Sequence, residues 1–183
     1  MINRSLSCLL LVAGLVGCSA TETPPSMSTD GALKHERTDD RRLGDVPEWM
    51  AAAGTDDALI CYLDAVEGGT PYGQGWQARQ GDAVRLAGWA VEQGTSEQLP
   101  AVVRLRAISS TNPDVYFAAL RSERPDVSAA PQFAGSPPSS AGLTATLLLD
   151  DVAPGEYEMA YVAGNAQHAL ACSLGPERVL RVQ

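Results

Sequence analysis

The sequence has few of the residues on which most enzymes depend. Two histidines occur among the 183 residues, and one of them, His35, lies in a segment without hydrophobic periodicity. A histidine pair is therefore not expected to bind a metal or to relay a proton. The Cys-x-x-Cys, Gly-x-Ser-x-Gly and Ser-x-x-Lys motifs are absent as well. We expect no catalytic residue, no metal and no cofactor.

Basic residues are scarce and scattered along the chain. Lys34 is the single lysine among 13 lysines and arginines, and 22 acidic residues bring the formal net charge to −9. Proteins that bind nucleic acids carry basic residues clustered on one face. Nucleic acid is therefore not an expected partner.

No apolar run is long enough to span a membrane, which takes roughly 20 residues. A shorter run, Leu6–Val16, follows the basic Arg4 and ends just before Gly17 and Cys18. A basic start followed by a short apolar segment is typical of a signal peptide. The pattern predicts an exported protein.

The start of the chain resembles the lipobox of bacterial lipoproteins, in which a small residue stands directly before a cysteine. The resemblance implies that residues 1–17 are a removed signal peptide and that Cys18 carries acyl chains such as palmitate. Ser19 follows the cysteine, which in this class implies the outer membrane, with a domain on its periplasmic or surface face. An ordinary signal peptide is the alternative, although it favours a small residue where Leu15 stands.

Two of the four cysteines remain after this processing, because Cys8 is removed and Cys18 is acylated. Cys61 and Cys172 then lie in an oxidising compartment, where disulfides persist. We predict a Cys61–Cys172 disulfide that ties the two ends of the domain together. Two buried free thiols are the alternative.

Residues 18–44 have the composition of a lipidated, flexible tether. They are rich in Pro, Ser, Thr and charged residues and nearly free of large apolar side chains. Such a segment cannot bury enough surface to order itself. We expect it to separate the domain from the membrane.

Residues 45–54 carry the signals of a short helix. Asp45 can cap it, Pro47 is tolerated in the first turn, and Glu48 stands at the capping-box position. We expect at most two turns, docked onto the domain by the pair Trp49-Met50.

Residues 58–183 consist of short apolar runs that Gly, Pro and Asp interrupt every eight to twelve residues or so, which is typical of an all-β domain. Val103 and Leu105 alternate with Arg104, as on a strand with one buried face. We predict an Ig-like antiparallel β-sandwich. The expected strands are Ala58–Val66, Gly75–Arg79, Ala83–Val91, Ala101–Ser109, Val115–Arg121, Leu143–Leu149, Tyr157–Ala163, His168–Ser173 and Arg178–Val182.

Trp89 breaks the alternation of its strand, because Val84 and Leu86 share a face that Trp89 does not. Glycine inside a strand often marks a bulge. A bulge at Ala87-Gly88 would turn Trp89 inward, and we predict that it is the central core residue. The alternative is an exposed aromatic platform for a ligand.

Several short motifs in the domain occur in a fixed order. They are Cys61-Tyr-Leu-Asp64, Gly88-Trp89-Ala90, Arg124-Pro125-Asp126-Val127, Ala141-Gly142-Leu143, Pro154-Gly155-Glu156-Tyr157 and Cys172. The ordered set resembles a β-sandwich module of bacterial envelope proteins that is sometimes appended to membrane-bound glycosyltransferases. The resemblance implies the sandwich fold and an envelope location, and no activity.

The long loop after Val115–Arg121 holds the candidate ligand-binding residues, Arg124 and Asp126. Arg124 can bind a carboxylate or phosphate bidentately, or it can hold Asp126 or a loop carbonyl in place. Pro125 favours the second role, because it suits a loop of fixed shape.

Together these features predict a lipid-anchored, non-enzymatic binding or assembly module of the cell envelope. Its expected partners are the membrane, through the anchor, and an envelope protein or glycan. A hydrolase of envelope polymers that uses paired carboxylates, as glycoside hydrolases do, is the alternative. Two carboxyl groups about 5–9 Å apart in a cleft would favour the hydrolase.

Overall fold

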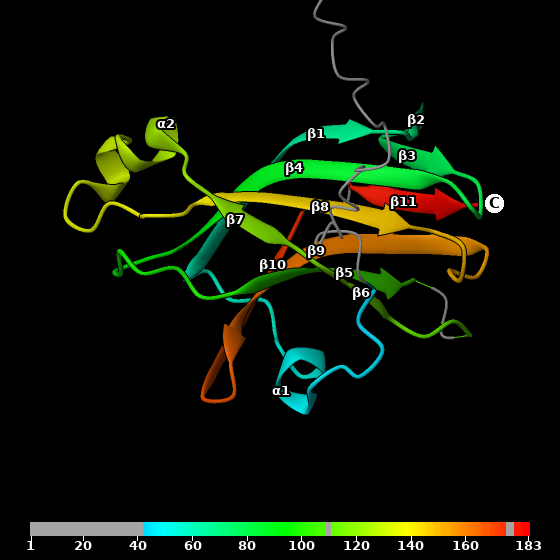
Figure 1. Cartoon of the computed structure of the whole chain (residues 1–183), viewed down its shortest axis with the longest axis horizontal. Helices are drawn as coiled ribbons and strands as arrows, with labels where there is room; N and C mark the ends of the chain where they lie inside the picture. Colours follow the sequence, from blue (N-terminus) through cyan, green and yellow to red (C-terminus); the bar gives the residue numbers. More distant parts are fainter. Residues whose placement is uncertain (1–41, 109–110, 175–177) are drawn as a thin grey trace, which may run out of the picture. The chain divides into compact units, whose positions relative to one another are not determined.

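Eleven strands in two sheets make up most of the described part of this computed structural model, which comprises residues 42–108, 111–174 and 178–183. One sheet has the order β1-β4-β8-β7, and the other has the order β2-β3-β11-β9-β5-β6, with β10 also paired to β9. The predicted all-β sandwich is confirmed (Figure 1). The strands are β1 Leu59–Glu67, β2 Thr70–Tyr72, β3 Gly75–Ala78, β4 Ala83–Glu92, β5 Ala101–Ala107, β6 Val115–Ala118, β7 Leu120–Ser122, β8 Gly142–Leu148, β9 Gly155–Asn165, β10 His168–Ser173 and β11 Val179–Val182.

The pairing departs from the predicted antiparallel pattern at one place. β11 pairs with β3 in parallel, whereas the other strand pairs of both sheets are antiparallel. The long strand β9 pairs with β5 along one edge, and with β11 and then β10 along the other. β9 is therefore the central strand of the seven-stranded sheet.

The core lies between the inner faces of the two sheets. Val103 and Leu105 on β5 are fully buried, as their alternation predicts, and so are Tyr157 and Met159 on β9. They pack against residues of the four-stranded sheet such as Leu86. Burying one such side chain contributes about 1.5–3 kcal/mol, so the many buried side chains of this layer stabilise the fold strongly.

The prediction that Trp89 is the central core residue is wrong. β4 keeps its regular alternation, and Gly88 rather than Trp89 faces the core, where a Cβ on Gly88 would lie 2.8 Å from the hydroxyl of Tyr161. The register shift lies in β1, between Leu63 and Ala65. Gly88 thus makes room for Tyr161, and Trp89 stands half-buried on the outer face.

Residues 42–56 cover the outer face of the seven-stranded sheet. The helix α1, Glu48–Ala51, is one turn long, and Met50 is buried against Val102 and Val162, with Trp49 partly buried beside it. The predicted docking by Trp49-Met50 is therefore confirmed.

The predicted cap of α1 is wrong. The N-cap residue is Pro47, and no side chain caps the helix, so Asp45 does not serve as the cap. Before it, the Leu43 amide donates to the Tyr116 carbonyl at 2.9 Å, which holds the chain extended along β6. Arg42 and Leu43, near the end of the predicted tether, thus contact the domain; the tether residues before them lie outside the described ranges.

The predicted strand Val115–Arg121 is two strands in different sheets. β6 pairs with β5, the chain passes Ala119, and β7 pairs with β8 of the other sheet. After β7 the chain forms two short helices on the four-stranded side. They are α2 Pro125–Ser128 and a 3₁₀ helix, Pro131–Phe133.

The predicted disulfide between Cys61 and Cys172 is present, with Cα atoms 6.1 Å apart. Cys61 lies on β1, at the edge of the four-stranded sheet, and Cys172 lies on β10 of the seven-stranded sheet. The bond therefore joins the two layers of the sandwich. It closes a loop of 111 positions.

Reduction of this disulfide is expected to lower the free energy of unfolding by about 2–5 kcal/mol. The bond lowers the conformational entropy of the unfolded chain, and this effect is large for a loop near 100 residues. Urea unfolding with and without reductant measures the change. The double variant Cys61→Ala/Cys172→Ala serves as the control, since reductant should not affect it. Thiol labelling of both cysteines in denatured, non-reduced protein would contradict the prediction.

Candidate functional site

Arg124 lies where the chain leaves β7 and begins α2, at the N-cap position before Pro125. In Figure 1 the segment that carries α2 lies beyond one end of the strands of the four-stranded sheet. The stem of Arg124 crosses the sheet at Gly142, where a Cβ would lie 2.9 Å from the Arg124 Cγ and 2.4 Å from the Ser122 Oγ. Glycine at this position of β8 therefore leaves the space that the arginine occupies.

The guanidinium of Arg124 binds two carboxylates. Its Nε and Nη2 donate to both oxygens of Asp126, at 2.8 and 2.6 Å, and its Nη1 donates to Asp64 at 2.6 Å. Arg124 thus holds Asp126 in place, which is the second of the two roles predicted for it. It also donates to Asp64, which was not predicted. Bidentate pairs of this kind fix orientation as well as charge.

Asp64 reaches Arg124 because of the irregularity in β1. The register shifts between Leu63 and Ala65, which makes Asp64 the extra residue of a bulge. Bulges re-aim a side chain, and they are frequent next to binding and active sites. Sequence reasoning did not identify Asp64, although alternation with the inward Cys61 and Leu63 would have placed it on the outer face.

The hydrogen bonds determine the charges of the group. The two bonds from Arg124 hold the pKa of Asp126 at about 2, below its usual range. The same bonds to Asp126, and then the bond to Asp64, raise the pKa of Arg124 above its usual value. Asp126 is therefore ionised and Arg124 is charged at neutral pH. The side chains of Arg124 and Asp64 are 28% and 36% exposed, so a ligand can reach them.

Two aromatic rings lie beside this charged group. Tyr62 and Trp89 are directly opposite each other on β1 and β4, and their ring centroids are 6.4 Å apart with an interplanar angle of 26°. Tyr62 is 53% exposed. Trp89 packs partly against an outer cluster that includes Val127 and Phe133. Trp89 is half-buried, so the exposed ring of the pair is Tyr62 and not Trp89.

We refer to Tyr62, Asp64, Trp89, Arg124 and Asp126 as the sheet-face site. It combines a supported aromatic ring with fixed donors and acceptors on one face of the four-stranded sheet. Such a face can bind a ligand, but it has no nucleophile activated by a neighbouring base.

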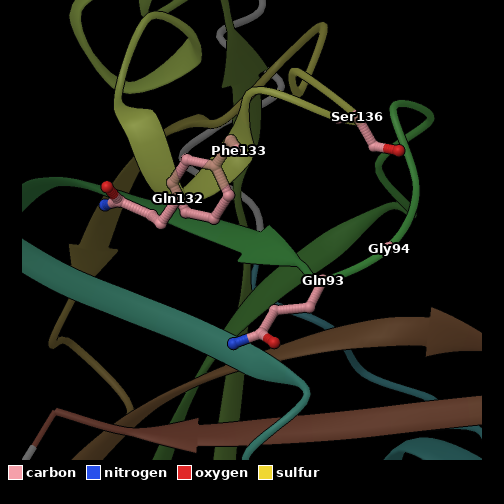
Figure 2. Close-up of a pocket in the computed structure, with 6 residues that line it drawn as sticks. Gln93, Gly94, Gln132, Phe133 and Ser136 are labelled. Carbon is pink, nitrogen blue, oxygen red and sulfur yellow. The ribbon is translucent and has the colours of Figure 1, made fainter.

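A small cavity opens between the turn after β4 and the 3₁₀ helix (Figure 2). Its volume is about 260 Å³. In Figure 2, Gln93 lies below Phe133, and Ser136 lies on the turn that follows the 3₁₀ helix, facing the loop that carries Gly94. The lining side chains carry no charge, and the cavity has no evident chemistry. The lining residues are Gln93, Gly94, Gln132, Phe133, Gly135 and Ser136.

A second cavity, of about 290 Å³, holds two carboxylates, Glu92 and Glu97. The Glu92 side chain is 7% exposed, and its Oε1 lies 3.3 Å from Nε2 of His168. Its Oε2 accepts a bond from the Leu99 amide at 3.4 Å. Both oxygens are thus engaged by neighbouring elements, which favours a structural role for this carboxylate.

Neither a metal centre nor a membrane span is found in the described ranges. Across residues 42–108, 111–174 and 178–183, no three His, Cys, Asp or Glu side chains gather in a group that could hold a metal ion. In the same ranges no helix is long and apolar enough to cross a membrane. Cys18, the predicted lipidation site, lies outside them.

Comparison with protein-family models, with curated proteins and with solved structures finds no match to this chain. The resemblances to bacterial lipoproteins and to an envelope β-sandwich module therefore stay predictions.

Replacing the guanidinium in Arg124→Gln is expected to raise the pKa of Asp126 from about 2 toward its ordinary 3.8. Because the pKa of Asp126 is depressed in the folded state, the ion pair stabilises that state fully at pH values above the ordinary 3.8. This stabilisation is lost as the pH falls through about 2. The carboxyl ¹³C shift of Asp126, followed by NMR, reports the midpoint.

Arg85→Gln is the matched control, because Arg85 also faces a carboxylate on this sheet, Glu67 at 3.8 Å, whereas the side-chain bonds to Asp126 come from Arg124. In this variant the titration midpoint of Asp126 should equal that of the unchanged protein. An equal midpoint in Arg124→Gln would show that the pair does not form in solution.

Proposed function

We propose that this protein is a lipid-anchored, non-enzymatic binding or assembly module of the bacterial outer membrane, and that it binds its partner through the sheet-face site. The anchor rests on the lipobox-like Leu15-Val16-Gly17-Cys18. The disulfide between Cys61 and Cys172 supports an oxidising compartment, because such bonds are rare in reducing cytosol.

The observation that carries the binding role is the exposed aromatic pair next to paired charges. An exposed tyrosine stacked on a tryptophan offers a large contact area with few rotatable bonds, which keeps the entropy cost of binding low. Tyr62 has this support from Trp89. Asp64, which follows closely on the same strand, and its partner Arg124 add oriented polar groups.

Two pairs of carboxylates favour the hydrolase alternative. They are Glu92 with Glu97 at one cavity, and Asp64 with Asp126 around Arg124. A general acid or nucleophile must be free to reach the scissile bond. Both Glu92 oxygens accept from or contact neighbouring groups, and Arg124 binds both aspartates, so the binding role is the better supported one.

The variant Cys18→Ala is expected to lose membrane attachment, because two or three acyl chains provide the anchor and each buried methylene contributes about 0.8 kcal/mol. Cell fractionation should then find the protein as a soluble form or an uncleaved precursor rather than in the outer-membrane pellet. Metabolic labelling with an alkynyl fatty acid provides the direct readout. An unlabelled wild-type protein would contradict the anchor.

A photo-crosslinking amino acid in place of Tyr62 is expected to capture a discrete partner in intact cells. The control carries the same amino acid in place of Tyr72, an exposed tyrosine of the other sheet, since the two are 53% and 45% exposed. An adduct at position 62 and none at position 72 supports the sheet-face site. Adducts at both positions, or at neither, contradict it.

A further inference from the structure

We infer that the sheet-face site takes an uncharged saccharide chain laid across the strands of the four-stranded sheet. This inference rests on the proposed binding function and names its ligand. It is carried by the way the aromatic pair, the carboxylates and the small outward side chains beside them are arranged.

The aromatic pair suits the apolar face of a sugar ring. Pyranose rings present C–H groups on one face and hydroxyls around the edge, and the negative face of an aromatic ring attracts such C–H groups. Tyr62 stands out on the edge strand β1, and Trp89 supports it from β4. Trp89 is itself packed against the outer cluster that includes Val127 and Phe133, which supports the platform from behind.

The charged group suits sugar hydroxyls, which both donate and accept hydrogen bonds. Arg124 uses three of its five N–H groups on Asp64 and Asp126, which leaves two donors. A carboxylate oxygen has two lone pairs, so both acids keep acceptor capacity. Since the three side chains already orient one another, a ligand does not have to order them.

Charge argues for a neutral saccharide rather than an acidic one. Two carboxylates and one guanidinium give the site a formal charge of −1, and the whole chain carries −9. Phosphate, sulfate or uronate groups would therefore be repelled, both at the site and on approach. Arg124 is not free to compensate, because it is already paired with both acids.

Arg124 itself spans part of the sheet, because its stem packs at Gly142 of β8 and its guanidinium binds Asp64 of β1. Beside it, Ala87 on β4 and Thr144 on β8 carry small side chains and are directly paired. Two strand spacings separate β1 from β8, roughly 10 Å, which is about the length of two pyranose rings. A chain can thus contact Tyr62 at one end and the Arg124 group along its side.

The test measures binding of defined tetrasaccharides to the full chain, purified in mild detergent with its disulfide intact. The neutral probes are chitotetraose, cellotetraose and maltotetraose, and the acidic probe is tetragalacturonate. Isothermal titration gives the affinities. We expect a neutral probe to bind at least ten-fold more tightly than the acidic one.

Tyr62→Ala and Arg124→Gln should each weaken binding of that probe at least ten-fold, whereas Tyr62→Phe keeps the ring and should bind within about two-fold of the unchanged protein. Tyr72→Ala is the matched control, because Tyr72 is also exposed and contacts an arginine, Arg181, on the other sheet. It should bind as the unchanged protein does. Circular dichroism verifies that each variant is folded.

The inference is overturned if no neutral probe binds, if tetragalacturonate binds more tightly, or if Tyr62→Ala binds normally. Loss of binding in Tyr72→Ala but not in Tyr62→Ala would place the ligand in the cavity lined by Tyr72, Glu156 and Arg181 and would equally overturn it. A protein adduct captured at position 62 without any saccharide binding rejects the saccharide but keeps the proposed function. Absence of any adduct at position 62 rejects the function itself.

Discussion

The inward position of residue 88 on β4 has no room for a side chain. A Cβ on Gly88 would lie 2.2 Å from the Tyr62 carbonyl oxygen of β1 and 2.8 Å from the hydroxyl of Tyr161, which belongs to the seven-stranded sheet. With glycine at this position β4 alternates without interruption, and Trp89 is directed to the outer face. The aromatic half of the sheet-face site thus depends on a core contact between the two layers.

The edge strand β1 is held from both of its faces. On the inner face Cys61 is bonded to β10 of the other sheet, and on the outer face Asp64 is bonded to Arg124. Exposed edge strands are prone to pair with other chains unless a bulge or a charge prevents it. β1 has both of these devices, and its disulfide also ties it to the other sheet.

Most strands were predictable from the sequence, and the failures have physical reasons. β2 carries three exposed residues, so its apolar pattern is too weak to detect. The break between β6 and β7 was not predicted because the apolar run continues through it. The chain changes sheets at Ala119, where the hydrophobicity of the sequence does not change. The Asp45 cap fails because pairing of Leu43 with β6 holds the preceding chain in another conformation.

The sequence by itself determined the all-β class and the inward and outward faces of strands such as β5, and it predicted the Cys61–Cys172 disulfide and Arg124 as a candidate binding residue. These are local properties, since side chains alternate along a strand whatever lies beside it. Only the tertiary structure decided that Trp89 faces outward, that Asp64 joins Arg124, and that Tyr62 stands beside both. Those facts depend on strand register and on contacts between residues far apart in the chain, which alternation along one strand does not encode.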